Sequence, residues 1–403
     1  MHKQTFRFVI EVFVMKKRFL LVILMLFLTV SCGGATGKKP KNKGLSGFKV
    51  EFAGDFDPGT PENRIDSLGK DIKTTINITA LGYDKKPLAD YNGEVEIGLL
   101  YGDNADVARI TVENGYAGNV SVKMRNCLDY DRVVVQEVKK HESEETYAPT
   151  GKIGVSPVFY TTVATISAIQ GTVKGAKGKP SAFNNRNLTL KDREMVVIAV
   201  IEGGFYLHEV GVEDYSSIYM YTYSTPYVDD NLEEAMSLPV GTLIESANGS
   251  VFEFFGFTEM SFPTFHPVYV DKDGKKTLKI DKSLIPEPKD VTGILNNDAE
   301  MEKHEASLVT VQNVSVAWFN ENDSSFVEYS QFPLETSDGR TIMAHTLYTA
   351  HLFNAVAEKP EEEDKAKHHY NFTGILKQHT SARPSTWILV PRDMEDIECL
   401  DCK

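Results

Sequence analysis

The chain has 403 residues, of which 41% are hydrophobic and 10% aromatic, a composition typical of folded rather than disordered protein. Its formal net charge is −14, which disfavours binding to phosphate backbones unless basic residues gather on one face. With only four cysteines the chain is not a disulfide scaffold, so its stability must come from packing.

The first predicted element is an export signal. Residues 16–32 read KKRFLLVILMLFLTVSC, in which three positive charges precede an apolar run, small residues and a cysteine. This is the pattern of a secretory signal, and it is shorter than the roughly 20 apolar residues of a membrane-spanning helix. Met15 is the expected initiator, because residues 1–14 add nothing that a signal needs.

The end of this segment, LTVSC at residues 28–32, resembles the lipobox of bacterial lipoproteins. The resemblance implies that residues 1–32 are removed as a signal peptide and that Cys32 carries the lipid. The alternative is an ordinary cleaved signal with an incidental cysteine. Losing residues 1–32 removes five basic residues and one acidic residue, which leaves a charge of −18. Gly33 stands where an aspartate retains some lipoproteins at the inner membrane, so the outer membrane is expected, on its periplasmic or surface side.

The first domain is predicted to be a β-sandwich over residues 48–140, after a flexible, polar tether at residues 33–47. Apolar and polar residues alternate, for example at 75–81 and 120–124, and turn residues separate the runs, which predicts two antiparallel sheets. Residues 79–97 and 110–122 resemble bacterial Ig-like modules, which implies a spacer or adhesion unit. The stretch at 141–151 is polar and acidic, and a linker is predicted at 141–162.

Two further β domains are predicted, at residues 163–290 and 291–403. The expected strands of the first lie at about 164–171, 195–200, 203–209, 217–222, 239–244 and 250–260. Their order, with IQG at 169–171 and GFYLHE at 204–209, resembles the OB-type β-barrel found beside extracellular bacterial nucleases and in cell-surface lipoproteins. The second domain repeats the scheme, with a charged insertion at 359–369 and a Cys-x-x-Cys tail. The predicted fold class is all-β: an Ig-like β-sandwich followed by two OB-like β-barrels in tandem.

The candidate ligand-binding residues are aromatic. Tyr219, Tyr221 and Tyr223 are spaced two apart and therefore share one face of a strand. Phe205 and Tyr206 on the preceding strand extend this set. In an OB-type barrel these two strands form the usual binding face, where aromatic rings stack on bases or sugars. The alternative is that the rings cover the barrel or pack against a neighbouring domain.

Common catalytic signatures such as Gly-x-Ser-x-Gly and His-Glu-x-x-His are missing from the sequence, and we predict no catalytic residue, metal site or cofactor. Three β domains also leave no room for the separate catalytic domain of the nucleases. Cys399 and Cys402 predict a small terminal disulfide or two free thiols, because a zinc site would need two further ligands.

The predicted function is a lipid-anchored, non-enzymatic protein of the cell envelope. Its expected partners are the membrane, through the N-terminal lipid, and a glycan, peptide or protein ligand; nucleic acid is less favoured because of the net charge. The alternative is an accessory or catalytic component of extracellular nucleic-acid or glycan hydrolysis.

Overall fold

The computed structural model describes residues 44–67, 70–104, 109–140, 146–171, 180–201, 203–229, 235–361, 367–382 and 385–402. The predicted signal, Cys32 and most of the predicted tether lie outside these residues. The structure is all-β, as predicted, with 51% strand and 9% helix. Among the described residues, none of the helices is long and apolar enough to cross a membrane. The chain divides into two compact units, Met1–Tyr160 and Thr161–Lys403.

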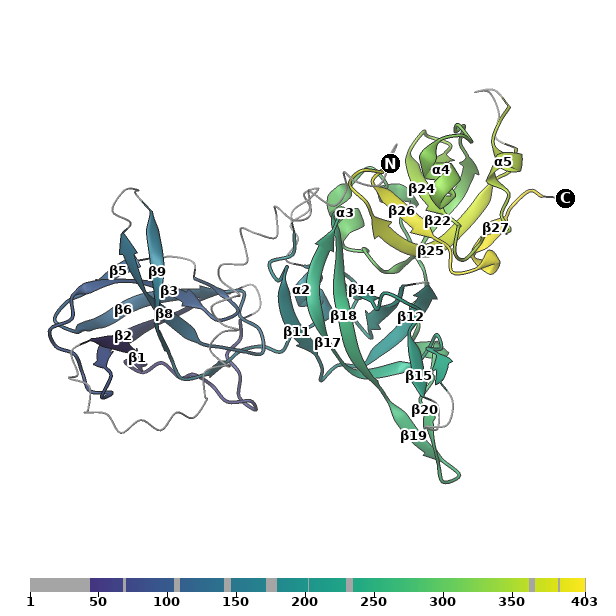
Figure 1. Ribbon diagram of the computed structural model, residues 1–403. Helices are drawn as coiled ribbons and strands as arrows, with labels where there is room; N and C mark the ends of the chain where they lie inside the picture. The colour runs from purple at the N-terminus through teal and green to yellow at the C-terminus, as the bar shows by residue number, and fades with distance from the viewer. Residues whose placement is uncertain are drawn as a thin grey trace, which may run out of the picture. The chain divides into compact units, whose positions relative to one another are not determined.

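The first unit contains two four-stranded antiparallel sheets (Figure 1). One sheet has the order β1 (Leu45–Ala53), β2 (Ile72–Gly82), β6 (Tyr116–Arg125) and β4 (Asp103–Asn104). The other has the order β5 (Arg109–Val112), β3 (Gly93–Leu99), β8 (Val133–Lys140) and β9 (Tyr147–Val155). A short pair joins β7 (Tyr130–Asp131) to β10 (Phe159–Tyr160).

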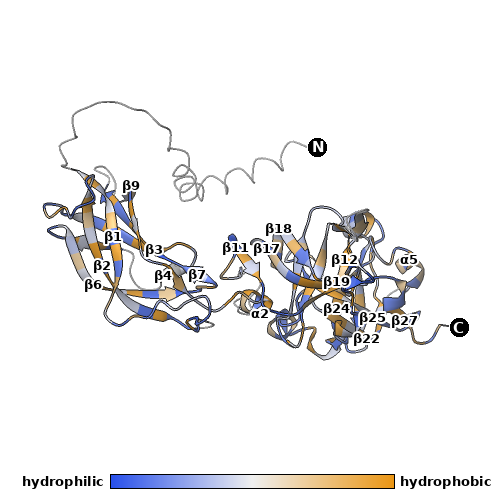
Figure 2. Ribbon diagram, turned by 90° about the horizontal axis from the view of Figure 1, so that it is seen from below, coloured by the Kyte–Doolittle hydropathy of each residue, from blue (hydrophilic) through white to orange (hydrophobic). Residues whose placement is uncertain are grey.

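Alternating side chains build the core of this unit. Along β2 every second residue is buried, among them Ile76 and Ile78, and Figure 2 shows apolar and polar segments alternating along these strands. Val95 of β3 and Val135 of β8, from the other sheet, belong to the same apolar cluster. The two sheets therefore enclose one core, because successive side chains of a strand point to opposite faces.

The predicted linker at 141–162 is wrong over Tyr147–Val155. These residues form strand β9, which pairs with β8 instead of connecting two domains. Pro149 has no N–H to donate, and it is tolerated because β9 lies at the edge of its sheet. Likewise, β1 begins at Leu45, inside the predicted tether.

In the second unit, five strands close into a barrel: β12 (Met195–Ile201), β13 (Gly204–Glu209), β14 (Ser217–Tyr221), β17 (Leu243–Phe254) and β18 (Phe257–Pro267). The antiparallel run β12-β13-β14 continues into β18, which lies parallel to β14. β18 pairs with β17, and β17 pairs with β12. The barrel is thus closed by pairings between strands that are distant in the sequence.

Two predicted elements of this barrel are wrong. The expected strand at 164–171 is instead the helix α2 (Ile166–Gln170), which Thr165 caps by accepting a hydrogen bond from the amide of Ala168. The expected break between 244 and 250 lies within β17, and the chain turns at Phe255 and Gly256, where φ is 53° and 89°. Two consecutive residues with positive φ suit the tight turn of a two-residue hairpin.

Shorter elements surround the barrel. β11 (Arg186–Leu190) pairs with β17, and two hairpins are formed by β15 (Tyr227–Asp229) with β16 (Ala235–Ser237) and by β19 (Tyr269–Lys272) with β20 (Lys275–Leu278). The 3-10 turns η2 (Lys282–Leu284) and η3 (Thr292–Ile294), strand β21 (Lys289–Asp290) and helix α3 (Asp298–Glu302) lead to the next sheet.

That sheet contains a second ring of five paired strands: β22 (Leu308–Val316), β23 (Gln331–Thr336), β24 (Thr341–His345), β25 (Tyr370–Gln378) and β26 (Trp387–Val390). β24 and β26 are parallel, and β22 pairs with both β23 and β25. Its other elements are α4 (Ser324–Tyr329), α5 (Ala355–Glu358), η4 (Met394–Asp396) and β27 (Ile397–Cys399). The predicted charged insertion lies between α5 and β25, with residues 362–366 outside the described part of the chain.

The barrel and the second ring share one buried cluster. Tyr206, Tyr219 and Phe257 of the barrel pack with Leu308 and Ile375 of the second ring. The backbone N–H of Thr380, after β25, donates to the carbonyl of Phe255 at 2.8 Å. The second unit is therefore a pair of rings in direct contact.

Candidate functional site

The candidate site is built on β13 and β14, which carry the predicted aromatic residues. Tyr206 lies opposite Tyr219 in this pairing, with ring centroids 4.8 Å apart. Their exposed fractions are 0% and 5%, and Phe205, which packs on Phe265, is also fully buried. These positions correct the expectation that Phe205, Tyr206 and Tyr219 offer a binding surface. The interior of the barrel and the second ring cover them.

The rings of Tyr219, Tyr221 and Tyr223 nevertheless follow one another, as their two-residue spacing predicts. Centroid distances are 6.1 Å for the first pair and 5.5 Å for the second. Exposure increases along this row: Tyr219 is buried, Tyr221 is half-buried and Tyr223 is 72% exposed. The row therefore leads from the shared core to the surface.

Phe262 of β18 lies beside the end of this row, a position that the sequence reasoning missed. Its ring is 71% exposed, lies 6.2 Å from that of Tyr223, and is nearly parallel to it at 16°. Phe262 lies beside Tyr223 because β18 runs parallel to β14, with Ser261 opposite Tyr221. Phe262 and Tyr223 both have positive φ, 50° and 71°, which is uncommon for aromatic residues. We call Tyr221, Tyr223 and Phe262 the aromatic surface.

The aromatic surface can stack and donate hydrogen bonds. Exposed rings stack on planar groups or on the faces of sugars. Burial, with the nearby Tyr223 and Glu259 as smaller causes, raises the pKa of the Tyr221 phenol. Its hydroxyl therefore stays protonated at neutral pH and can donate a hydrogen bond.

A buried histidine–serine pair lies on the same two strands. His208 Nδ1 is 3.0 Å from Ser217 Oγ, but their exposed fractions are 5% and 0%. Burial lowers the pKa of His208 to about 4, so its ring is neutral at physiological pH. Because both side chains are enclosed, the pair offers no surface on which a substrate could bind.

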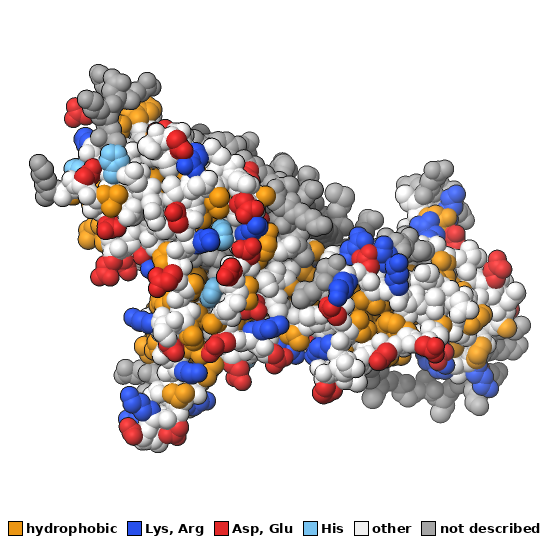
Figure 3. Space-filling model, turned by 180° about the vertical axis from the view of Figure 1, so that it is seen from behind, with side chains coloured by type: hydrophobic (Ala, Val, Ile, Leu, Met, Phe, Trp, Pro, Cys, Tyr) orange, Lys and Arg blue, Asp and Glu red, His pale blue; other side chains and the backbone are white. Residues whose placement is uncertain are grey.

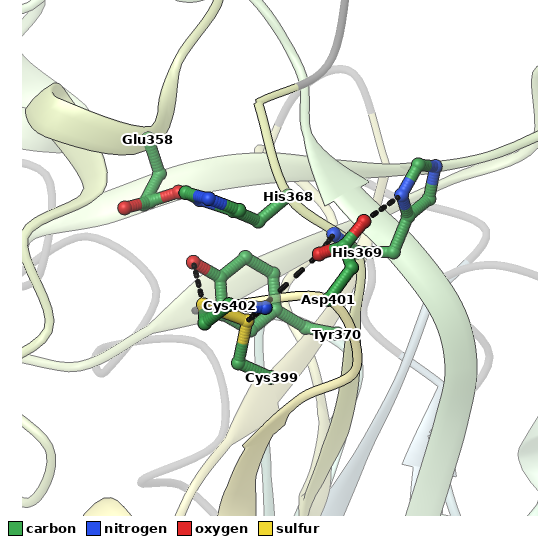
Figure 4. Close-up of a disulfide and its surroundings, with 7 residues drawn as sticks. All are labelled: Glu358, His368, His369, Tyr370, Cys399, Asp401 and Cys402. Atoms are coloured by element: carbon green, nitrogen blue, oxygen red, sulfur yellow. Dashed lines mark hydrogen bonds and ion pairs between the residues drawn. A yellow bond between two sulfur atoms is a disulfide. The ribbon is translucent and has the colours of Figure 1, made fainter.

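The two C-terminal cysteines, Cys399 and Cys402, are joined in a disulfide (Figure 4). The bridge lies beside Tyr370, whose Oη is 3.9 Å from Cys402 Sγ. Asp401, between the cysteines, accepts hydrogen bonds from the backbone N–H and the Nδ1 of His369, both at 2.9 Å. These hydrogen bonds attach the disulfide loop to the residue that precedes β25.

No three or more His, Cys, Asp or Glu side chains in the described part of the chain are placed to hold a metal ion. Comparisons of the chain with protein-family models, with curated proteins and with solved structures found no match.

Proposed function

We propose that this protein is a lipid-anchored, non-enzymatic binding protein of the cell envelope that holds a glycan or peptide on the aromatic surface. The observation that carries the proposal is the nearly parallel pair of Tyr223 and Phe262, each more than 70% exposed. Large apolar rings are normally buried, and an exposed group of them is typical of an interaction site.

The order of the strands supports this proposal. Counted in chain order, the barrel runs 1-2-3-5-4 and closes from 4 to 1, with strands 3 and 5 parallel, and the second ring has the same order. We infer that both are OB-type barrels and that the first unit is an Ig-like spacer. In OB-type barrels the second and third strands carry the binding face, and Tyr221 lies on the third.

Charge favours a ligand without many phosphates. The mature chain would carry a net charge of −18. On the face shown in Figure 3, acidic and basic side chains are interspersed rather than gathered into one basic field. Stacking on a ring is worth about 1–3 kcal/mol whatever the planar group, whereas each phosphate also meets repulsion that salt screens only partly. A glycan or peptide is therefore favoured over nucleic acid.

The test is a binding survey with the mature chain, in which residue 32 is serine so that the protein is soluble. A glycan array, a peptide library and a single-stranded DNA titration should identify a glycan or peptide. Tyr223→Ala and Phe262→Ala should each weaken that ligand about 5- to 150-fold, the equivalent of about 1–3 kcal/mol.

Tyr348→Ala is the matched control. Tyr348 is 52% exposed on the second ring, and its loss should leave the affinity unchanged. Equal effects of all three substitutions, or tight DNA binding that weakens steeply with salt, would refute the proposal.

A further inference from the structure

Four glutamates lie where the barrel meets the second ring. Glu253 is on β17, Glu259 on β18, Glu302 on α3, and Glu305 just after α3. The exposed fractions are 7% for Glu259, 5% for Glu302 and 1% for Glu305, and Glu253 is half-buried. An ionised carboxylate in such surroundings is strongly disfavoured unless a cation or several donors compensate it. We call these four residues the glutamate cluster.

In the carboxyl groups of Glu253 and Glu305, hydrogen bonds reach only one of the two oxygens. Glu253 Oε1 accepts from Thr258 Oγ1 at 2.6 Å and from the N–H of Ser181 at 2.9 Å. Glu305 Oε1 accepts from the N–H of Thr258 at 3.0 Å. Within the described residues, the buried Oε2 atoms of both glutamates have no hydrogen-bond partner. A bare negative charge on these oxygens is therefore poorly compensated.

Among the residues that the structure describes, few cations face the glutamate cluster. Lys377 of β25 lies near Glu259, with its Nζ 5.4 Å from the centroid of the Phe257 ring. Two histidines of the second ring are also near Lys377. Burial first, and Lys377 second, lowers the pKa of His345 to about 4 and also lowers the pKa of His379, so both rings are neutral at pH 7.

The remaining neighbours add negative charge or none. Asp298 of α3 faces Glu302, and the neutral Gln378 donates to Glu302 Oε2 at 3.4 Å. The hydroxyl of Tyr206, fully buried, lies near Glu259 and Glu305. Within the described part of the chain, these neighbours leave a marked excess of carboxyl groups at the junction.

The glutamate cluster lies among the contacts that join the two rings. Ala306, next to Glu305, belongs to the shared apolar cluster, and its N–H donates to the carbonyl of Leu376 on β25 at 2.8 Å. Thr258, which binds both Glu253 and Glu305, is on the barrel side. Charge that develops on Glu305 would therefore act directly on the junction.

We propose that the glutamate cluster is a proton-dependent clasp. It holds the barrel and the second ring together while its carboxyl groups keep a proton, and it loosens the junction when they ionise.

The direction of the titration agrees with this geometry. Burial, then the charges of Glu253 and Asp298, raise the pKa of Glu302 to about 7. Burial, then the charges of Glu302 and Glu253, raise the pKa of Glu305 well above its usual range. A carboxyl whose pKa is raised by folding favours the closed state most below its unfolded-state pKa, and this contribution is lost as the pH rises from the unfolded-state pKa to the folded-state pKa. The junction should therefore weaken as the pH rises above about 4.5, and the part that Glu302 contributes should be lost by about pH 7.

Hydrogen exchange of the mature chain, again with serine at residue 32, tests the clasp at about pH 5.5, 7 and 8.5. After correction for intrinsic rates, exchange at the amides of Thr258 and Thr380 should rise at least about tenfold across this range, because one pKa unit of linkage corresponds to a factor of ten. Exchange at Ile78, in the core of the first unit, should stay constant. A flat profile at Thr258 and Thr380 in the unmodified chain would overturn the proposal without any variant.

Glutamate-to-glutamine variants, which keep the size of the side chain but cannot ionise at that position, test whether protonation controls the junction. The double change Glu302→Gln with Glu305→Gln removes two of the four ionisable groups, the two from the segment at α3, so it should strongly reduce the rise in exchange. Glu300→Gln is the matched control, because its partly exposed side chain is on the same helix and pairs with Lys303. It should leave the profile of the unmodified chain in place. If calcium suppressed exchange at alkaline pH in the unmodified chain but not in Glu305→Gln, a cation rather than a proton would neutralise the cluster, and the clasp would be rejected.

Discussion

At the scale of single residues, the aromatic row depends on a glycine. Gly204 lies opposite Tyr221, and a Cβ at this position would be 2.4 Å from the carbonyl oxygen of Met220 and 2.7 Å from the ring of Tyr219. Both neighbours are in the barrel wall, so neither can move away easily. The absence of a side chain at residue 204 is what lets the Tyr219 ring lie across β13.

Gly204→Ala should therefore destabilise the second unit by about 1–3 kcal/mol, the usual effect of overpacking a core. Gly293→Ala is the control, because a Cβ there would meet nothing within 4 Å. Its free energy of unfolding should be unchanged or slightly higher. Urea unfolding measures the free energy of unfolding of both variants. Equal values would show that the barrel wall can shift to accommodate a Cβ at residue 204, and would contradict the prediction.

At the scale of elements, α2 is a helix that its surroundings impose. Five residues are far fewer than the roughly 12–15 that an isolated helix needs in water. Its support comes from elsewhere: Ser181 Oγ donates to the carbonyl of Ile169 at 2.8 Å, and Gln170 Nε2 donates to that of Ser217 at 2.9 Å. Local alternation alone predicted a strand here.

The N-cap residue of α2, Thr165, can be tested by substitution. Thr165 is 3% exposed, and its Oγ1 accepts from the N–H of Ala168 at 3.0 Å. Thr165→Ala leaves that N–H without its partner and should cost about 0.5–2 kcal/mol. Thr165→Ser keeps the oxygen and should retain most of the stability in the same urea titration. A serine variant as unstable as the alanine variant would assign the loss to the methyl group instead.

At the scale of the whole molecule, attachment to the membrane depends on the proposed lipid. Cys32 lies outside the described residues, so its role rests on the signal-like segment before it. Metabolic labelling with a fatty-acid probe should label the unmodified protein and not Cys32→Ser. The double variant Cys399→Ser with Cys402→Ser should be labelled like the unmodified protein, because these cysteines form the terminal disulfide. Equal labelling of Cys32→Ser would contradict the anchor.

The sequence by itself determined the all-β class. For many strands it also determined which residues face a core. This information is local, since alternation with a period of two places Ile76 and Ile78 on one face whatever the rest of the chain does. Local alternation also brought Tyr219, Tyr221 and Tyr223 into one row.

Only the tertiary structure decided which of these rings reach solvent. The parallel pairing of β14 with β18 brings Phe262 to Tyr223 from a distant part of the chain. Contact with the second ring, through Leu308 and Ile375, encloses Tyr219. Burial depends on such non-local contacts, which periodicity does not contain. For the same reason, the glutamates that meet at the junction carry no common signal in the sequence.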